Sequence, residues 1–148
     1  MMDANSSGRS TLRILDGVRI LVVEDNLFNT LAINAYLRHW GCDMDHASNG
    51  IEALQRLNPS HHLVLMDIHM PEMDGLEATH LLRLRGETLP IIALTADYTL
   101  DEQQDIYGGG FSAILYKPIK PRELLDQIQQ FTGQPSSMAD GVADELLP

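Results

Sequence analysis

The sequence predicts an α/β fold in which helices cover both faces of a five-stranded parallel sheet. Four short runs are apolar at every position, which is typical of strands buried on both faces; these runs are 20–23, 63–66, 91–94 and 113–116. Longer segments between them carry apolar residues at helical spacing. Because the links are short, the crossovers should be right-handed, and helices should lie above and below the sheet.

The first three strand–helix units are expected between residues 19 and 85. A strand at about 19–24 contains the first apolar run, and a helix at about 27–40 follows it. The second strand, at about 43–46, leads to a helix that starts after Ser48-Asn49-Gly50. The third strand, at about 63–67, ends in an acidic residue, and a helix at about 76–85 follows.

Two further units complete the predicted sheet. The fourth strand covers about 91–94, and its helix covers about 98–107. Glycines 108–110 end that helix, because each interior glycine is unfavourable by about 1 kcal/mol. The fifth strand covers about 113–116 and the last helix about 121–131. Pro121 suits the first turn of that helix, where a missing N–H is no loss.

The composition narrows the functional classes. A formal net charge of −11 argues against nucleic acid or an anionic membrane surface as a direct partner. The one cysteine, Cys42, excludes an internal disulfide and a cysteine-based zinc site, and it indicates a reducing compartment. No apolar run approaches the ~20 residues needed to cross a bilayer, and no signal peptide is visible. We therefore expect a cytoplasmic protein without direct membrane contact.

The length of 148 residues fits one domain with polar tails. Residues 1–17 are expected to be a disordered tail or linker, because Ser, Asn and Gly are frequent there. Residues 132–148 are expected to be a flexible C-terminal tail, with a weak helical turn at 142–147. The domain itself is expected at 18–131.

The helix expected at 27–40 has two apolar faces. One stripe is suited to cover the sheet and consists of Ala32, Ile33, Tyr36, Leu37 and Trp40. A second patch lies round the other side and consists of Leu27, Phe28, Leu31 and Ala35. Two interpretations stay open: ordinary apolar residues that are exposed or buried on a second side, or a docking surface for a partner's helix.

Polar residues follow four of the predicted strands. They are the pair Glu24-Asp25, then Asp67, Thr95 and Lys117. In an open parallel sheet, functional groups gather beyond the carboxyl ends of the strands. Clustered carboxylates repel one another unless a cation neutralises them, and Mg²⁺ prefers oxygen ligands. The pattern therefore indicates a site for a divalent cation and a phosphoryl group.

Each of these residues also has an ordinary structural interpretation. Asp67 alone could cap a helix, Lys117 could be a solvated charge, and Thr95 could be a β-branched strand residue. As a set they support phosphoryl chemistry, in which Asp67 is the nucleophile and forms an aspartyl phosphate. Lys117, held extended before a proline, would pair with Asp67 and then with a phosphoryl oxygen, to which Thr95 would donate its hydroxyl.

These residues lie in segments that resemble a response-regulator receiver domain over about 18–131. The matching segments are 21–26, 47–54, 63–75, 93–96 and 117–119. The resemblance implies a flavodoxin-like (βα)5 three-layer sandwich with the parallel sheet order 2-1-3-4-5. It also implies a module of a two-component or phosphorelay system, which is not an enzyme in the ordinary sense; any histidine kinase activity would lie in a segment not present here.

The resemblance assigns roles to the site residues. Asp67 would accept a phosphoryl group from a phosphohistidine, and Asp25 and Asp67 would bind Mg²⁺ directly. Glu24 would act through water, and the backbone carbonyl of His69 would supply a further ligand. Thr95 and Lys117 would hold the phosphoryl oxygens.

The residues around the site look like those of receivers in hybrid sensor histidine kinases. Asn26, Asn29 and the approach at 15–19 support this subtype, as does Ile119 after the proline. The expected partner is a histidine kinase or a histidine phosphotransfer domain, docked on the patch of Leu27, Phe28, Leu31 and Ala35. We expect a monomer.

Two features depart from or refine the family pattern. Receivers that switch an output surface usually have an aromatic residue three positions before the lysine, where this chain has Ile114; Tyr116 is expected to point to the opposite side of the strand. His69 and Asp97 lie two residues beyond Asp67 and Thr95, where they would border the phosphate and influence its lifetime, or would be solvated loop side chains. His61 and His62 are expected to be exposed.

Three other functional classes share parts of this pattern. A haloacid-dehalogenase-type phosphohydrolase needs a second aspartate two residues after the nucleophile, where this chain has His69. A flavin protein of this fold needs a phosphate-cradling loop after the first strand, where Glu24-Asp25 would repel a phosphate. An unphosphorylated receiver-like interaction module remains the alternative, and retention of the whole set of site residues argues against it.

Overall fold

The computed structural model describes residues 13–133 and places five parallel strands in the order β2-β1-β3-β4-β5. The strands are β1 (Arg19–Val23), β2 (Asp43–Ala47), β3 (Leu63–Asp67), β4 (Ile91–Thr95) and β5 (Ala113–Tyr116). This confirms the predicted fold class and strand order. β3 and β4 are buried along their whole length, as expected of central strands covered on both faces.

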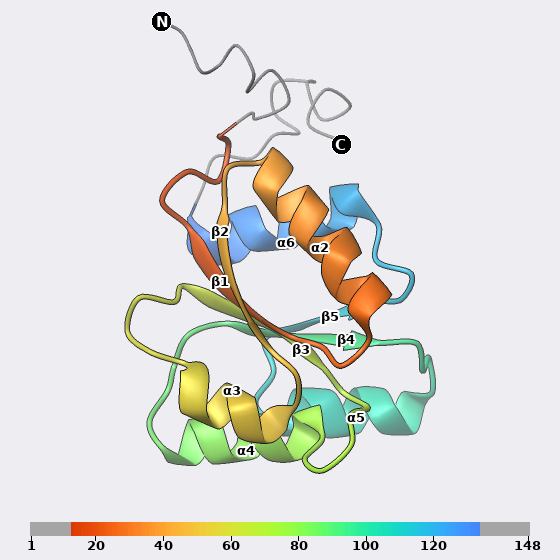
Figure 1. Ribbon diagram of the computed structural model, residues 1–148. Helices are drawn as coiled ribbons and strands as arrows, with labels where there is room; N and C mark the ends of the chain where they lie inside the picture. The colour runs from red at the N-terminus through yellow and green to blue at the C-terminus, as the bar shows by residue number, and fades with distance from the viewer. Residues whose placement is uncertain (1–12, 134–148) are drawn as a thin grey trace, which may run out of the picture.

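Two helices cover one face of the sheet and three cover the other (Figure 1). The first layer holds α2 (Leu27–His39) and α6 (Pro121–Thr132); the second holds α3 (Gly50–Arg56), α4 (Gly75–Leu84) and α5 (Leu100–Gly108). α5 begins two residues later than predicted, because Thr99 is its N-cap and accepts a hydrogen bond from the Glu102 N–H. Among residues 13–133, no helix has both the length and the apolar character needed to span a bilayer.

Alternating residues of the strands form two separate cores. Ile20 and Val22 of β1 pack with the helices α2 and α6, whereas Leu21 and Val23 pack with α3, α4 and α5. This is the two-residue period of a strand with helices on both sides. Helices therefore pack on both faces of the sheet, as predicted.

The folded part begins earlier than the predicted boundary at residue 18. Leu15 is fully buried in the core beside α2 and α6, and its N–H donates to the Trp40 carbonyl at 2.8 Å. Part of the segment expected as a tail therefore belongs to the domain. The expected tails at 1–12 and 134–148, with the helical turn at 142–147, lie outside the described residues.

The expectation that His61 is exposed is wrong, whereas His62 is exposed. The His61 Nε2 lies 2.7 Å from Asp45 Oδ2, and its Nδ1 accepts the Asn58 N–H at 3.2 Å. Because Nδ1 is an acceptor, Nε2 carries the proton and donates it to Asp45. The hydrogen bond from His61 holds the pKa of Asp45 below its usual value. This pair ties β2 to the turn before β3.

Candidate functional site

The acidic residues converge at the carboxyl ends of β1 and β3. Glu24 and Asp67 are buried and Asp25 is exposed, and one carboxylate oxygen of each lies within 4.8 Å of the others. Together with Lys117 they line a shallow cleft, whose residues are Glu24, Asp25, Asn26, Asn29, Asp67, His69, Ala96 and Lys117. The structure thus brings together four of the five residues singled out from the sequence.

Backbone contacts fix where these side chains lie. Val23 is in register with Met66, so the residues that follow β1 and β3 leave the sheet side by side. The loop after Asp67 folds back tightly, and the Gly75 N–H donates to the Ile68 carbonyl at 2.8 Å. A Cβ at Gly75 would lie 2.2 Å from the Asp67 carbonyl oxygen. Only glycine permits this approach, which positions the loop around the site.

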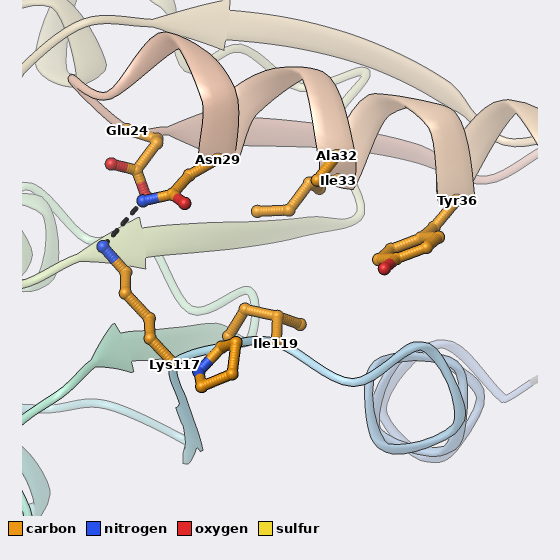
Figure 2. Close-up of a pocket in the computed structure, with 8 residues that line it drawn as sticks. Glu24, Asn29, Ala32, Ile33, Tyr36, Lys117 and Ile119 are labelled. Atoms are coloured by element: carbon orange, nitrogen blue, oxygen red, sulfur yellow. Dashed lines mark ion pairs between the residues drawn. The ribbon is translucent and has the colours of Figure 1, made fainter.

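Lys117 reaches across the cleft from the end of β5 (Figure 2). Its Nζ lies 3.1 Å from Asp67 Oδ1 and 3.1 Å from Glu24 Oε1. The peptide bond between Lys117 and Pro118 is cis. Burial alone would lower the pKa of Lys117, but the carboxylates of Asp67 and Glu24 outweigh it, and the pKa is raised. Lys117 is therefore a fixed positive charge.

The buried site carries more negative than positive charge. One ammonium faces Glu24 and Asp67, and the third carboxylate, Asp25, lies beside them. Glu24 Oε2 accepts the Asn26 N–H at 3.1 Å, but Glu24 Oε1 is buried and makes no well-directed hydrogen bond. Burial, and then the charge of Glu24, raise the pKa of Asp67 to about 7. A hard dication with oxygen ligands would satisfy these groups.

Thr95 lies at the end of β4 but its hydroxyl is engaged elsewhere. It is buried; its Oγ1 donates to Glu102 Oε2 at 2.5 Å and accepts the Asp97 N–H at 3.1 Å. In this state the hydroxyl therefore does not contact the Asp67–Lys117 pair. Thr95 therefore lies at the strand end where it was predicted, but its hydroxyl donates to Glu102 of α5.

His69 and Asp97 border the same part of the cleft. The His69 ring is largely exposed, and its Nε2 lies 3.0 Å from Glu102 Oε1. Asp97 accepts the Thr99 N–H at 2.8 Å, and this backbone hydrogen bond is the main cause of its lowered pKa. Each side chain therefore has one protein partner while it stays accessible to solvent.

Glu102 is the residue that the sequence analysis missed. It is only 9% exposed and contacts both Thr95 and His69. Its local signal, a threonine three residues earlier, is typical of a helix-capping pair and gives no hint of a role at the site. Its partners come from β4 and from the loop after β3, so only the tertiary structure reveals them.

The predicted orientation of Tyr116 is wrong. Residues 114 and 116 lie two apart on β5, so they share a face, and Ile114 packs with the core under α5. The ring of Tyr116 stacks on Tyr98, with centroids 4.3 Å apart, and its hydroxyl accepts a hydrogen bond from Gln103 of α5. An aromatic side chain is therefore present on the side where the sequence analysis expected none.

Helix α2 presents its second apolar patch to solvent. Leu27 is 66% exposed, Phe28 79% and Leu31 53%, and Ala35 is also exposed. The stripe predicted to cover the sheet is only partly buried: Ile33, Leu37 and Trp40 are buried, whereas Ala32 is exposed. A pocket joins this helix to the site (Figure 2), lined by Glu24, Asn29, Ala32, Ile33, Tyr36, Lys117, Pro118 and Ile119.

Known proteins are similar to this chain in sequence and in fold. Residues 20–129 match the family described as the response regulator receiver domain. Histidine kinase 5 of Arabidopsis thaliana is 33% identical over 142 residues, which cover 76% of this chain and 15% of that protein. Sensor histidine kinase GacS of Pseudomonas protegens is 36% identical over 121 residues, which cover 78% of this chain and 13% of that protein. The chain thus spans a small part of these relatives.

Solved structures of receiver domains are similar to this chain as well. The receiver domain of a sensor histidine kinase from Pseudomonas aeruginosa PAO1, with a magnesium ion coordinated in its active site cleft, is 35% identical; the TM-score is 0.72, covering 80% of this chain and 99% of that chain. The receiver domain of a Saccharomyces cerevisiae response regulator, crystallised with a histidine phosphotransfer signaling protein, is 25% identical; the TM-score is 0.73, covering 80% and 90%. With the sheet order and the family match, these findings show that this chain belongs to the response-regulator receiver domain family, a family of signalling modules.

Proposed function

We propose that this receiver takes a phosphoryl group from a phosphohistidine onto Asp67 and passes it on or signals by it. The observation that carries the proposal is the placement of Asp67: it is buried at a strand end, 3.1 Å from Lys117, inside a cluster with excess negative charge. This carboxylate also lines the cleft, from which a phosphoryl donor would approach. Its neighbours can balance the charge that the phosphoryl group brings.

In the transfer, a carboxylate oxygen of Asp67 attacks phosphorus, an O–P bond forms, and the N–P bond to the donor imidazole breaks. The electron pair of that bond goes to the imidazole nitrogen. Lys117 releases Asp67 Oδ1 and pairs with a phosphoryl oxygen, and Thr95 donates its hydroxyl to another. These residues hold the phosphoryl oxygens where negative charge develops.

Magnesium fits the acidic cluster. The carboxylates of Asp25 and Asp67 would bind it directly, Glu24 would act through water, and the His69 backbone carbonyl would add a further ligand. When bound, Mg²⁺ neutralises carboxylate and phosphoryl charge. One ammonium shared between Glu24 and Asp67, and the raised pKa of Asp67, both support the binding of a further positive charge here. We also propose that His69 and Asp97 set the lifetime of the phosphate.

A histidine kinase or a histidine phosphotransfer domain is the proposed partner. It would dock on the exposed patch of Leu27, Phe28, Leu31 and Ala35, beside the pocket that leads to Lys117. The yeast relative crystallised with a histidine phosphotransfer protein supports this class of partner. With a net charge of −11, we propose no nucleic-acid partner. We further propose a cytoplasmic monomer whose receiver domain corresponds to residues 18–131 with the preceding buried turn.

Intact mass after incubation with acetyl phosphate and Mg²⁺ tests the proposal. We expect the mass of one phosphoryl group to be added to the wild-type protein. It should not be added to Asp67→Asn, nor to the wild type after chelation of Mg²⁺. A folded wild-type protein that gains no mass would contradict the proposal and favour the unphosphorylated interaction module.

A further inference from the structure

The single hydroxyl proton of Thr95 is committed to Glu102. Thr95 Oγ1 donates to Glu102 Oε2 at 2.5 Å, and its lone pair accepts the Asp97 N–H at 3.1 Å. A threonine hydroxyl has one proton to donate. Thr95 therefore cannot donate to a phosphoryl oxygen until its bond to Glu102 breaks.

The carboxylate of Glu102 is not used to cap its own helix. Thr99 and Glu102 have the spacing of a capping box, in which the glutamate would accept the N–H of the threonine. Thr99 accepts the Glu102 N–H at 3.3 Å, which is half of that motif. However, the Thr99 N–H donates to Asp97 at 2.8 Å. Asp97 thus takes the place of Glu102 as the acceptor of the Thr99 N–H, and the carboxylate of Glu102 is left to face the site.

His69 holds the other oxygen of the same carboxylate. Its Nε2 lies 3.0 Å from Glu102 Oε1, and Glu102 is 9% exposed. Glu102 therefore has one fixed partner on each oxygen. If Thr95 turned away, Glu102 Oε2 would lose its hydrogen bond in a largely buried place, which is unfavourable.

We propose that Glu102 is a positioning residue that competes with the phosphoryl group for the Thr95 hydroxyl. This inference rests on the proposed function at Asp67. In the unphosphorylated protein Glu102 holds the hydroxyl toward α5. On phosphorylation the hydrogen bond passes from Glu102 Oε2 to a phosphoryl oxygen, and the first turn of α5 loses its link to β4. Glu102 thereby slows phosphorylation and connects it to α5.

The rate of phosphorylation by acetyl phosphate at saturating Mg²⁺ tests this competition. Because Glu102 competes for the Thr95 hydroxyl, Glu102→Ala should be phosphorylated about three- to tenfold faster than the wild type. This factor corresponds to part of the free energy of one hydrogen bond to a charged group. Asp101→Ala is the matched control, because Asp101 is exposed in the same turn and loses the same charge. Its rate should equal that of the wild type. Equal rates for Glu102→Ala and the wild type would overturn the inference.

A double-mutant cycle separates the hydrogen bond from the charge. In a Thr95→Ala background, which has no hydroxyl to compete for, Glu102→Ala should bring no gain. A gain that persists there would be an effect of charge alone and would overturn the inference. Glu102→Gln keeps the shape of the side chain and one acceptor oxygen, so its phosphorylation rate should lie between those of the wild type and Glu102→Ala. This variant replaces Glu102→Ala in the test if the alanine variant does not fold.

The resting bond can be observed without phosphorylation. The Thr95 hydroxyl proton should give a slowly exchanging ¹H NMR resonance in the wild type and not in Glu102→Ala. Rapid exchange in the wild type would overturn the inference. A wild type that shows the resonance but takes no phosphoryl group would instead contradict the proposed function, so the two failures are distinguishable.

Discussion

The two halves of the cleft are built differently. The acidic half consists of Glu24, Asp25, Asp67 and Lys117, and it lies beside α2. The hydroxyl half consists of Thr95, Asp97, Glu102 and the His69 ring, and it lies beside α5. In the acidic half two buried carboxylates share the ammonium of Lys117, which lies 3.1 Å from each, and the pKa of Asp67 is raised to about 7. In the hydroxyl half the side chains of Thr95, Asp97, Glu102 and His69 each have a partner.

The two halves of the cleft thus differ in what they lack: the acidic half has unbalanced negative charge, whereas the hydroxyl half has its hydrogen bonds satisfied. The acidic half has more carboxylates than its one ammonium can balance, and the proposed Mg²⁺ would supply the remaining positive charge. The hydroxyl half is already satisfied, so it must break a bond before it can contribute to phosphoryl binding. Under the proposed function, the first half would favour loading of the site, and the second half would link loading to a change at α5.

The largest effect should be on the free energy of unfolding, when the ionisable carboxyl group of Asp67 in the acidic half is removed. Because the pKa of Asp67 is raised from 3.8 to about 7, the folded state binds this proton more tightly than the unfolded state does. The free energy of unfolding therefore falls as the pH rises between about 4 and 7. Asp67→Asn lacks this loss, so above pH 7 it should be more stable than the wild type by about 2–4 kcal/mol.

Urea unfolding from pH 5 to pH 8 without Mg²⁺ measures this difference. The gap between Asp67→Asn and the wild type should widen with pH and level off roughly one pH unit above the pKa of about 7. Mg²⁺ should narrow it, because the cation stabilises the ionised wild type. A gap that stays constant with pH would show that the acidic half carries no excess charge.

The helices beside the two halves can be compared with matched substitutions. Leu31 on α2 is 53% exposed and Leu100 on α5 is 67% exposed. Leu31→Glu should slow transfer from a phosphorylated histidine phosphotransfer domain by roughly 30-fold, the effect of one interface hot spot of about 2 kcal/mol. Leu100→Glu should leave transfer unchanged. Labelling by acetyl phosphate should stay normal in both variants.

Transfer rates from a purified, phosphorylated donor domain check this. Equal slowing by both substitutions would indicate a general effect of added negative charge rather than docking on α2. Loss of acetyl phosphate labelling in Leu31→Glu would indicate damage to the site itself.

The smallest effect is expected at the rim of the hydroxyl half. The Asp97 carboxylate lies beside the cleft and can orient an attacking water, so Asp97→Ala should slow loss of the phosphoryl group a few-fold. Asp97→Asn keeps an acceptor for the Thr99 N–H and should separate this role from the cap of α5. Phosphate lifetime after removal of acetyl phosphate is the measurement, with Mg²⁺ affinity as the quantity that should not change. An unchanged lifetime in both variants would remove Asp97 from the chemistry.

The fold and most of the acidic half could be predicted because they follow from local pattern and direction. Parallel strands expose their carboxyl ends at one edge, so residues that follow β1, β3 and β5 meet whatever the details of the loops. The same reasoning placed Thr95 at the correct strand end. The two-residue period of strands also puts Tyr116 on the side of Ile114, although the sequence analysis expected the opposite side.

The sequence by itself determined which elements form, their order, and which carboxylates and ammonium meet at the sheet edge. Only the tertiary structure decided where hydrogen bonds go. His61 is buried with its Nε2–H satisfied, because Asp45 of β2 accepts a hydrogen bond from it. Thr95 can donate to Glu102 because Asp97, rather than Glu102, accepts the N–H of Thr99, the N-cap of α5. A hydrogen bond depends on a few tenths of an ångström and on side-chain rotation, and segments distant in sequence set both.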